Sequence, residues 1–240
     1  MPQEASPHIV RSYEGELRRL REMIARMGGL AERQVADSAQ ALIRRDTDLA
    51  AEVVRRDAEL DQMEREVEQF CVRLLALRQP MAADLRLIIA AMKISSDLER
   101  IGDYARNGAK RAIVVAQQSL ISSLNGFERM SELVQENLRS AIDALVEEDA
   151  EKADEVWRSD EPIDGIYNGI FRELLTFMME DPRNITAATH LLFIAKNMER
   201  IGDHATNIAE RVHFVVRGEQ VTADRPKGDD SASAVAGAPR

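Results

Sequence analysis

The stretch LERIGDYARNGAKR occupies residues 98–111, and the similar stretch MERIGDHATNIAER occupies residues 198–211. With one more position included, residues 97–111 match residues 197–211 at nine of fifteen places. A second pair of similar segments, 41–61 and 144–164, aligns at a shift of 103 residues. Self-similarity at a near-constant period is the signature of a duplicated structural unit. The sequence therefore predicts a tandem duplication.

The composition favours helices. Of the 240 residues, 45% are hydrophobic but only 4% are aromatic, and Ala, Leu, Glu, Arg and Met fill long stretches. Apolar residues recur at intervals of three and four, as they do on one face of an amphipathic helix. We therefore predict an all-α fold, a tandem duplication of a three-helix bundle. Its six long antiparallel helices are expected at about 8–44, 47–77, 80–117, 126–147 and 150–179, with the sixth ending near 217.

Signals for helix ends also occur twice. Asp46 and Asp149 stand where an N-cap is expected, and Gln79-Pro80 and Asp181-Pro182 stand where a helix should stop. The polar segment SLISSLNG, 119–126, is the expected seam between the copies. The predicted units are a first three-helix repeat over 8–120, a second over 124–218 and a disordered tail over 219–240.

Charge and hydropathy exclude several classes of protein. The net charge of −10 argues against a nucleic-acid binder and favours divalent cations or basic protein surfaces as partners. The longest apolar run, 85–94, is broken by Arg86 and Lys93 and is too short to cross a bilayer. No secretory signal is visible at the N-terminus, so we expect a cytoplasmic protein. The lone Cys71 is expected to be a buried apolar residue.

The repeated stretch has an apolar face and an acidic face. At 100° per residue, one side of each copy is apolar, and these residues are expected in the core: Leu98, Ile101, Ala105, Gly108, Ala112, Met198, Ile201, Ala205, Ile208 and Val212. Glu99 with Asp103, and Glu199 with Asp203, are spaced i,i+4 on the other side and are expected to face the surface. Two carboxylates at this spacing repel each other, so helix stability alone does not explain their repetition.

Two further acid pairs point to a metal site in each copy. Asp57 with Asp61 and Asp160 with Asp164 have the same i,i+4 spacing, beside the apolar stripes of the second and fifth predicted helices. If neighbouring helices pack antiparallel, four carboxylates converge in each copy. Hard or borderline divalent cations accept such oxygen ligands. An alternative is that Arg100 and Arg200 neutralise the acids in a salt-bridge network without an ion.

Gly102 and Gly202 stand inside these helical stretches, where each costs about 1 kcal/mol relative to Ala. We therefore expect both to mark points where two helices approach closely.

The segments 78–112 and 197–218, which contain both copies of the repeated stretch, closely resemble the two signature regions of the PhoU family. The resemblance covers about residues 8–218 and implies two similar three-helix bundles related by a pseudo-twofold axis. It also implies multinuclear iron or other metal clusters on acidic motifs, here Asp57, Asp61, Glu99, Asp103, Asp160, Asp164, Glu199 and Asp203. The resemblance leaves the metal open among Fe, Zn, Mn, Mg and Ni. Tyr104 and Gly108 face His204 and Ile208 in the alignment, so the two sites are expected to differ.

The resemblance further implies a regulatory role. The family represses the phosphate-starvation response and modulates phosphate uptake. It is thought to act as an adaptor between the ATPase subunit of a phosphate ABC transporter (PstB-like) and a sensor histidine kinase (PhoR-like). We therefore expect a non-enzymatic protein, without catalytic residues, that reaches the membrane only through its partners. Long amphipathic helices also favour a homodimer.

Two other functions agree with parts of the sequence. Residues 210–213 spell Glu-x-x-His, the spacing used by carboxylate-bridged di-iron enzymes, but such a bundle needs the motif twice and the aligned residues 110–113 do not repeat it. A purely structural bundle or dimerisation module explains the helices but leaves the repeated acids unexplained. The histidines His190, His204 and His213 are expected to be surface or interhelical residues rather than ligands.

Overall fold

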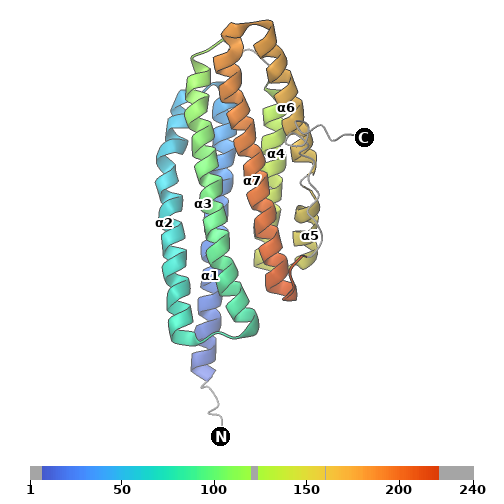
Figure 1. The fold of residues 1–240 in the computed structure, drawn as a ribbon. Coiled ribbons are helices and arrows are strands. Elements are labelled where there is room, and N and C mark those ends of the chain that lie inside the picture. Colours follow the sequence, from blue (N-terminus) through green and yellow to red (C-terminus); the bar gives the residue numbers. More distant parts are fainter. Residues whose placement is uncertain (1–6, 120–123, 160, 222–240) are drawn as a thin grey trace, which may run out of the picture.

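The computed structural model describes residues 7–119, 124–159 and 161–221, and the regular structure in these ranges is entirely helical, which confirms the all-α prediction. Figure 1 shows the elements in chain order. They are α1 (Pro7–Arg44), α2 (Thr47–Arg78), α3 (Ala82–Ala116), α4 (Asn125–Glu147), α5 (Ala150–Arg158), α6 (Glu161–Glu180), the 3₁₀ helix η1 (Pro182–Asn184) and α7 (Ile185–Arg217).

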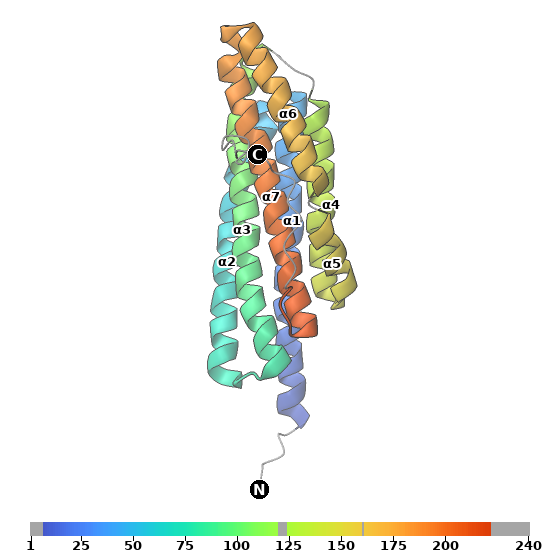
Figure 2. The same ribbon diagram turned by 45° about the vertical axis from the view of Figure 1, so that its right-hand side comes forward.

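The helices form two bundles of three rods that lie side by side. Helices α1, α2 and α3 pack on one another, and α4, α5 and α6 pack with α7 in the same way. The bundles join where α1 meets α4 and where α3 meets α7. The turn between α2 and α3 lies at one end of the elongated molecule and the turn between α6 and α7 at the other (Figures 1 and 2). Helices α3 and α7, which carry the repeated stretch, therefore run along the seam between the bundles.

The fifth predicted helix is divided, because α5 ends at Arg158 and α6 begins at Glu161. Pro162 has no N–H, and in a continuous helix its ring would clash with the carbonyl of residue 158. The aligned residue of the first copy is Glu59, which permits a helix, and α2 runs through it without a break.

Helix ends follow the predicted signals. The Asp46 carboxylate accepts the backbone N–H groups of Asp48 and Leu49, at 3.1 and 2.9 Å, and the Asp149 carboxylate accepts that of Lys152, at 3.0 Å. These bonds satisfy N–H groups that have no partner within the helix. Helix α2 stops before Gln79-Pro80, as predicted, and α6 stops before Asp181-Pro182. The predicted seam, 119–126, falls largely on residues 120–123, which lie outside the described residues, as do 222–240 of the predicted disordered tail.

The core consists of the predicted apolar faces. All ten core positions predicted in the repeated stretches are buried, and Cys71 is buried as well. In the described ranges, no helix has a run both long enough and apolar enough to cross a membrane.

Gly102 marks a close approach of α3 and α2, as predicted. A Cβ at this position would stand 2.4 Å from Leu60 Cδ1, inside van der Waals contact, and Leu60 is fully buried. We expect Gly102→Ala to lower the free energy of unfolding by about 2 kcal/mol, because a packed core resists an added methyl group. Chemical denaturation measures this change.

Gly169→Ala is the matched control for Gly102→Ala. Gly169 is exposed in α6, and no atom would lie within 4 Å of a Cβ there. Since alanine is the better helix former, this substitution is expected to raise stability by up to about 1 kcal/mol. Equal effects of the two substitutions would show that Gly102 is not a packing contact.

Candidate metal centre

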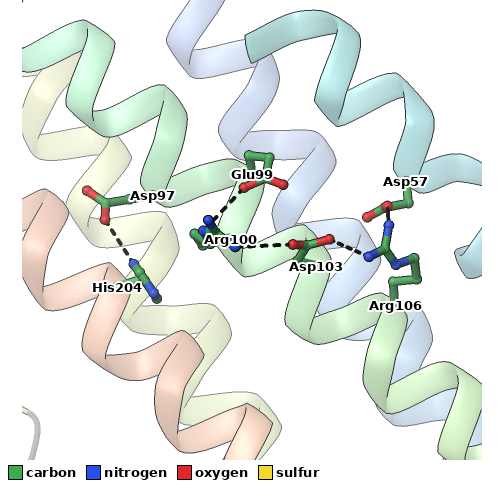
Figure 3. A network of polar contacts seen from close by, with 7 residues as sticks. All are labelled: Asp57, Asp97, Glu99, Arg100, Asp103, Arg106 and His204. Atoms are coloured by element: carbon green, nitrogen blue, oxygen red, sulfur yellow. Dashed lines mark hydrogen bonds and ion pairs between the residues drawn. The ribbon is translucent and has the colours of Figure 1, made fainter.

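The first predicted site lies where α2 packs on α3. Asp57 and Asp61 come from α2, and Glu99 and Asp103 come from α3. Figure 3 shows Asp57, Glu99 and Asp103 on the side where α2 packs on α3. The side chain of Asp57 is only 5% exposed, whereas those of Glu99 and Asp103 are 19% and 21% exposed. The acids therefore sit in the groove between the helices rather than in bulk water.

The acids of this groove raise one another's pKa. Burial raises the pKa of Glu99 to about 7, and repulsion from Asp103, Glu64 and Asp61 adds to this effect. Burial also raises the pKa of Asp57, while the nearby Arg106 opposes that shift and Asp61 and Asp103 reinforce it. Asp61 and Asp103 thus raise the pKa of both Asp57 and Glu99, and Glu64 also raises that of Glu99.

Arginine side chains occupy the first site in this structure. Arg106 pairs with Asp57 through Nη1 and with Asp103 through Nη2, the latter at 2.6 Å. Arg100 lies 3.7 Å from Glu99 and 3.6 Å from Asp103, but its own side chain is 59% exposed. A guanidinium thus bridges the two helices in the position between the acids (Figure 3). The contacts of Arg100 with Glu99 and Asp103 agree with the salt-bridge alternative. The guanidinium carbon of Arg200 instead lies 5.6 Å from the centroid of the Tyr104 ring.

The second site is built in the same way from α6 and α7. Asp164 and Glu199 are buried, Asp203 is half-buried, and Asp160 lies outside the described residues. Burial raises the pKa of Glu199, and repulsion from Asp203 and Asp164 adds to the rise. Lys196 contacts Glu199 Oε1 at 2.8 Å, whereas Glu199 Oε2 is buried without a hydrogen-bond donor.

The expectation that these acids face the surface is wrong for Glu199, which is only 7% exposed. Glu99, Asp103 and Asp203 are half-buried. The neighbouring helix covers them, because an acidic row beside an apolar stripe falls at the edge of the packing interface rather than on the outer face. Buried carboxylates without full pairing are costly, so these sites need a positive charge.

The donor chemistry fits a hard or borderline divalent cation, since both sites consist of carboxylate oxygens. The orphan oxygen of Glu199 and the raised pKa of Glu99 both indicate negative charge that the protein does not fully compensate. In the ranges that the structure describes, however, no three His, Cys, Asp or Glu side chains are arranged to hold one ion. A metal therefore has to displace Arg106 or Lys196, and the metal assignment stays a prediction.

Each site has an internal cation at a different sequence position. Arg106 of the first repeat aligns with Thr206 of the second, and Lys196 of the second aligns with Ser96 of the first. Thr206 is buried and donates to the Gly202 carbonyl, so it carries no charge into its site. The two sites therefore differ, and the difference lies beside the acid pairs rather than in them.

A buried carboxamide on α1 adjoins the first site, and another occupies the aligned position on α4; the sequence-based prediction included neither of them. Gln34 on α1 is fully buried, and neither of its amide atoms has a partner. A Cβ at Gly102 would stand 3.4 Å from Gln34 Oε1 and 3.5 Å from Asp57 Oδ1, so the amide lies next to the acid. Asn137, the residue of α4 at the same shift of 103, accepts from Ser159 Oγ at 2.9 Å and leaves its Nδ2 unpaired. Aligning the two repeats at a shift of 103 identifies Gln34 and Asn137 as equivalent positions.

The histidines lie between helices, as predicted. His204 Nδ1 contacts Asp97 Oδ1 at 2.9 Å across the seam between the bundles (Figure 3), and His213 Nδ1 contacts Asp154 Oδ1 at 2.6 Å. His190 lies 3.5 Å from Arg111. Glu210, the other half of the Glu-x-x-His motif, accepts from Trp157 Nε1 at 3.0 Å. Glu210 and His213 thus have separate protein partners, and this arrangement does not favour a di-iron site.

Known proteins share the repeated domain and the fold of this chain. The PhoU domain matches this chain twice, at residues 24–112 and 127–212, which together span most of it. The chain belongs to the PhoU family. Its repeat of α1–α3 and α4–α7 is the PhoU domain in two copies, and both acid-bearing helices α3 and α7 lie inside the matches.

The relatives of this PhoU protein cover nearly all of it. The "phosphate-specific transport system accessory protein PhoU homolog" of Caulobacter vibrioides is 54% identical over 92% of this chain and 97% of its own length. The homologue of the same name from Rhizobium meliloti is 48% identical, over 92% and 94%. The crystal structure of PhoU from Pseudomonas aeruginosa superposes with a TM-score of 0.83 at 43% identity, over 86% of this chain and all of that one. PhoU from Streptococcus pneumoniae, described as a phosphate transport system regulatory protein, gives 0.82 at 29% identity, over 88% and 100%.

Proposed function

We propose that this PhoU protein is an accessory protein of phosphate-specific transport that represses the phosphate-starvation response and modulates phosphate uptake. The observation that carries the proposal is the 54% identity to the Caulobacter accessory protein over 92% of the chain. Both PhoU domains are present, and the fold matches that of a described phosphate transport regulator. The fold alone does not require the acid pairs. All eight acids are nevertheless present in the sequence, seven of them at described positions and the eighth at Asp160.

In this proposal the protein is a cytoplasmic adaptor between the transporter ATPase and the phosphate-sensing histidine kinase, and it is not an enzyme. An acidic helical surface with a net charge of −10 suits basic patches on such partners, since complementary charge accelerates and orients association. A homodimer remains part of the proposal, because long amphipathic helices favour self-association. These partners follow from the family resemblance and not from the geometry.

Divalent cations are the proposed cofactor. Asp57, Asp61, Glu99 and Asp103 would hold metal in the first repeat, and Asp160, Asp164, Glu199 and Asp203 in the second. Bound metal would offset the repulsion that raises the pKa of Glu99 and would link the α2 and α3 rods at one point. This linkage would make each bundle stiffer, which suits a protein that holds one partner in its silent state.

Deletion of the gene tests the regulatory role. We expect alkaline phosphatase, a reporter of the phosphate-starvation response, to be expressed at high phosphate in the deletion strain, because the repressing component is gone. Enzyme activity in cells grown with ample phosphate is the measurement. Restoring the wild-type gene must restore repression.

The acids are tested in the same strain. A gene with Glu99→Gln and Asp103→Asn is expected to restore repression incompletely if metal at the first site contributes to regulation. A purely structural bundle predicts full repression from this gene, together with a small gain in protein stability. Unchanged alkaline phosphatase in the deletion strain itself would contradict the proposed function.

A further inference from the structure

A pocket of about 260 Å³ lies on the seam between the bundles, away from the acid pairs. Helix α3 contributes Ile89 and Lys93, helix α7 contributes Arg211 and Phe214, and Val221 lies at its edge beyond the end of α7. Its volume is close to the lower end of the range of small-molecule sites. Ile89, Phe214 and Val221 give it apolar walls, and Lys93 and Arg211 give it two cations.

The cations around this pocket have hydrogen-bond donors that are not used. The Nε atoms of Arg211 and Arg86 are buried without acceptors. Arg211 lines the pocket, whereas Arg86 lies beside it, two turns before Lys93 on α3, and is not among the lining residues. The Arg86 guanidinium carbon would lie 3.3 Å from a Cβ on Gly218, which places this arginine at the end of α7. Lys93 is exposed and has no ion-pair partner among the residues that the structure describes. A buried charged donor without an acceptor is costly, so these groups suit an anionic ligand.

Two acids lie near these cations. Glu210 also lines the pocket, and the hydrogen bond that its Oε1 accepts from the neutral Trp157 indole does not offset the charge of a carboxylate. Asp97, one turn from Lys93 on α3, is bound by His204 and by Arg211 Nη2, the latter at 3.0 Å. Arg211 is thereby held in place while its Nε stays unpaired. Since Glu210 and Asp97 offset two of the three cations, Lys93, Arg86 and Arg211 together leave a net charge of +1.

The other half of the molecule lacks this arrangement. At a shift of 100, Lys93 corresponds to Phe193, Arg86 to Thr186 and Arg211 to Arg111. There the Arg111 guanidinium stacks on the Phe193 ring, 4.1 Å from its centroid. The duplication thus has an arginine in both halves. Lys93 and Arg86 accompany Arg211, whereas the aligned positions that accompany Arg111 hold Phe193 and Thr186.

We propose that this pocket binds a small oxyanion of the phosphate-monoester class, with the charged group on Lys93 and Arg211, the Arg86 cation beside them, and an apolar group against Ile89 and Phe214. Guanidinium groups match the geometry of phosphate oxygens, and lysine adds a point charge. The inference does not depend on metal binding or on the proposed regulatory partners.

Calorimetric titration of the full chain with phenyl phosphate tests the pocket. A chelator is present throughout, so that metal on the acid pairs cannot recruit the anion. We expect saturable binding that Lys93→Phe, which copies the second repeat, weakens roughly tenfold or more through loss of one charge-assisted contact. Lys93 is exposed, so this variant is expected to fold, and a thermal melt checks that it does.

Phe193→Lys is the matched control, because it makes the reverse exchange at the aligned position of the other half, outside the proposed pocket, and it should leave binding unchanged. Inorganic phosphate competing with phenyl phosphate would support the site and identify the free anion as sufficient. Failure of inorganic phosphate to compete would also support it and show that the ester's apolar group is needed. No saturable binding of phenyl phosphate, equal binding by Lys93→Phe, or equal binding of benzyl alcohol would overturn the proposal. Each of these results leaves the metal-site and regulatory proposals untouched.

Discussion

Replacing Arg106 with threonine is expected to open the first acidic site to metal. Arg106 bridges Asp57 and Asp103, and the Asp57 side chain is only 5% exposed, so its removal leaves a buried carboxylate without its partner. We expect the metal-free variant to lose about 3 kcal/mol of stability. Since a divalent cation no longer competes with a tethered guanidinium, its affinity for this site should rise roughly tenfold or more. Thermal melts with increasing Mn²⁺ measure both effects.

The substitution copies Thr206 of the second repeat, which is why a threonine is chosen. Arg129→Thr is the control, because Arg129 is exposed on α4 of the other bundle and the same charge is lost there. It should change neither the metal-free stability nor the response to Mn²⁺ by more than about 0.5 kcal/mol. A variant at Arg106 that is destabilised but gains nothing from added cation would show that the arginine is a structural bridge and not a stand-in for metal.

Glu99→Gln is expected to stabilise the metal-free protein at alkaline pH. The pKa of Glu99 is raised from 4.5 to about 7 in the folded protein, so the folded state holds this proton more tightly than the unfolded state does. The stability contributed by the protonated carboxyl is therefore fully present below about pH 4.5 and is lost as pH rises through about 7. At about pH 8 the glutamine variant should be more stable by about 2 kcal/mol, because it never ionises. Urea denaturation with a chelator present, repeated across this pH range, measures the change.

Glu59→Gln on the exposed side of α2 is the control for the pH series, since it removes a carboxylate outside the cluster. Its stability should follow that of the wild type at every pH. If Glu99→Gln and the wild type lose stability in parallel between about pH 5 and about pH 8, the carboxylates around Glu99 do not repel one another as described.

Most of the fold was predictable because the helix signals are local and occur twice. Asp46 and Asp149 cap helices as expected, and the apolar faces that contain Leu98 and Met198 are buried. The break before α6 was missed, although Pro162 marks it in the sequence, because the apolar period of the segment continues across the break. A repeat alignment of Pro162 with Glu59 shows that the two copies differ there.

The site was predictable only in part. The i,i+4 spacing identifies which acids share a helix face, and antiparallel packing brings the α2 and α3 acids together. Burial of Glu199 and the cations Arg106 and Lys196 depend on how deeply neighbouring helices interlock, and spacing along one helix does not contain that information. Gln34 and Asn137 come from a third helix, which the acid motif does not include.

The two repeats hold different cations beside their acids, Arg106 in the first and Lys196 in the second. Arg106 contacts acids from both α2 and α3, whereas Lys196 contacts Glu199 Oε1 on α7 and lies 5.0 Å from the centroid of the Tyr167 ring on α6. The two sites therefore differ in the groups that a bound metal would displace.

Equilibrium dialysis of purified protein against a divalent metal, followed by elemental analysis, tests the central claim that paired acids on neighbouring helices bind cations. The wild type should retain metal saturably, and the combined variant Glu99→Gln, Asp103→Asn, Glu199→Gln and Asp203→Asn should retain none while still folded. Retention of equal metal by that variant, or of none by the wild type at saturating concentration, would contradict the claim.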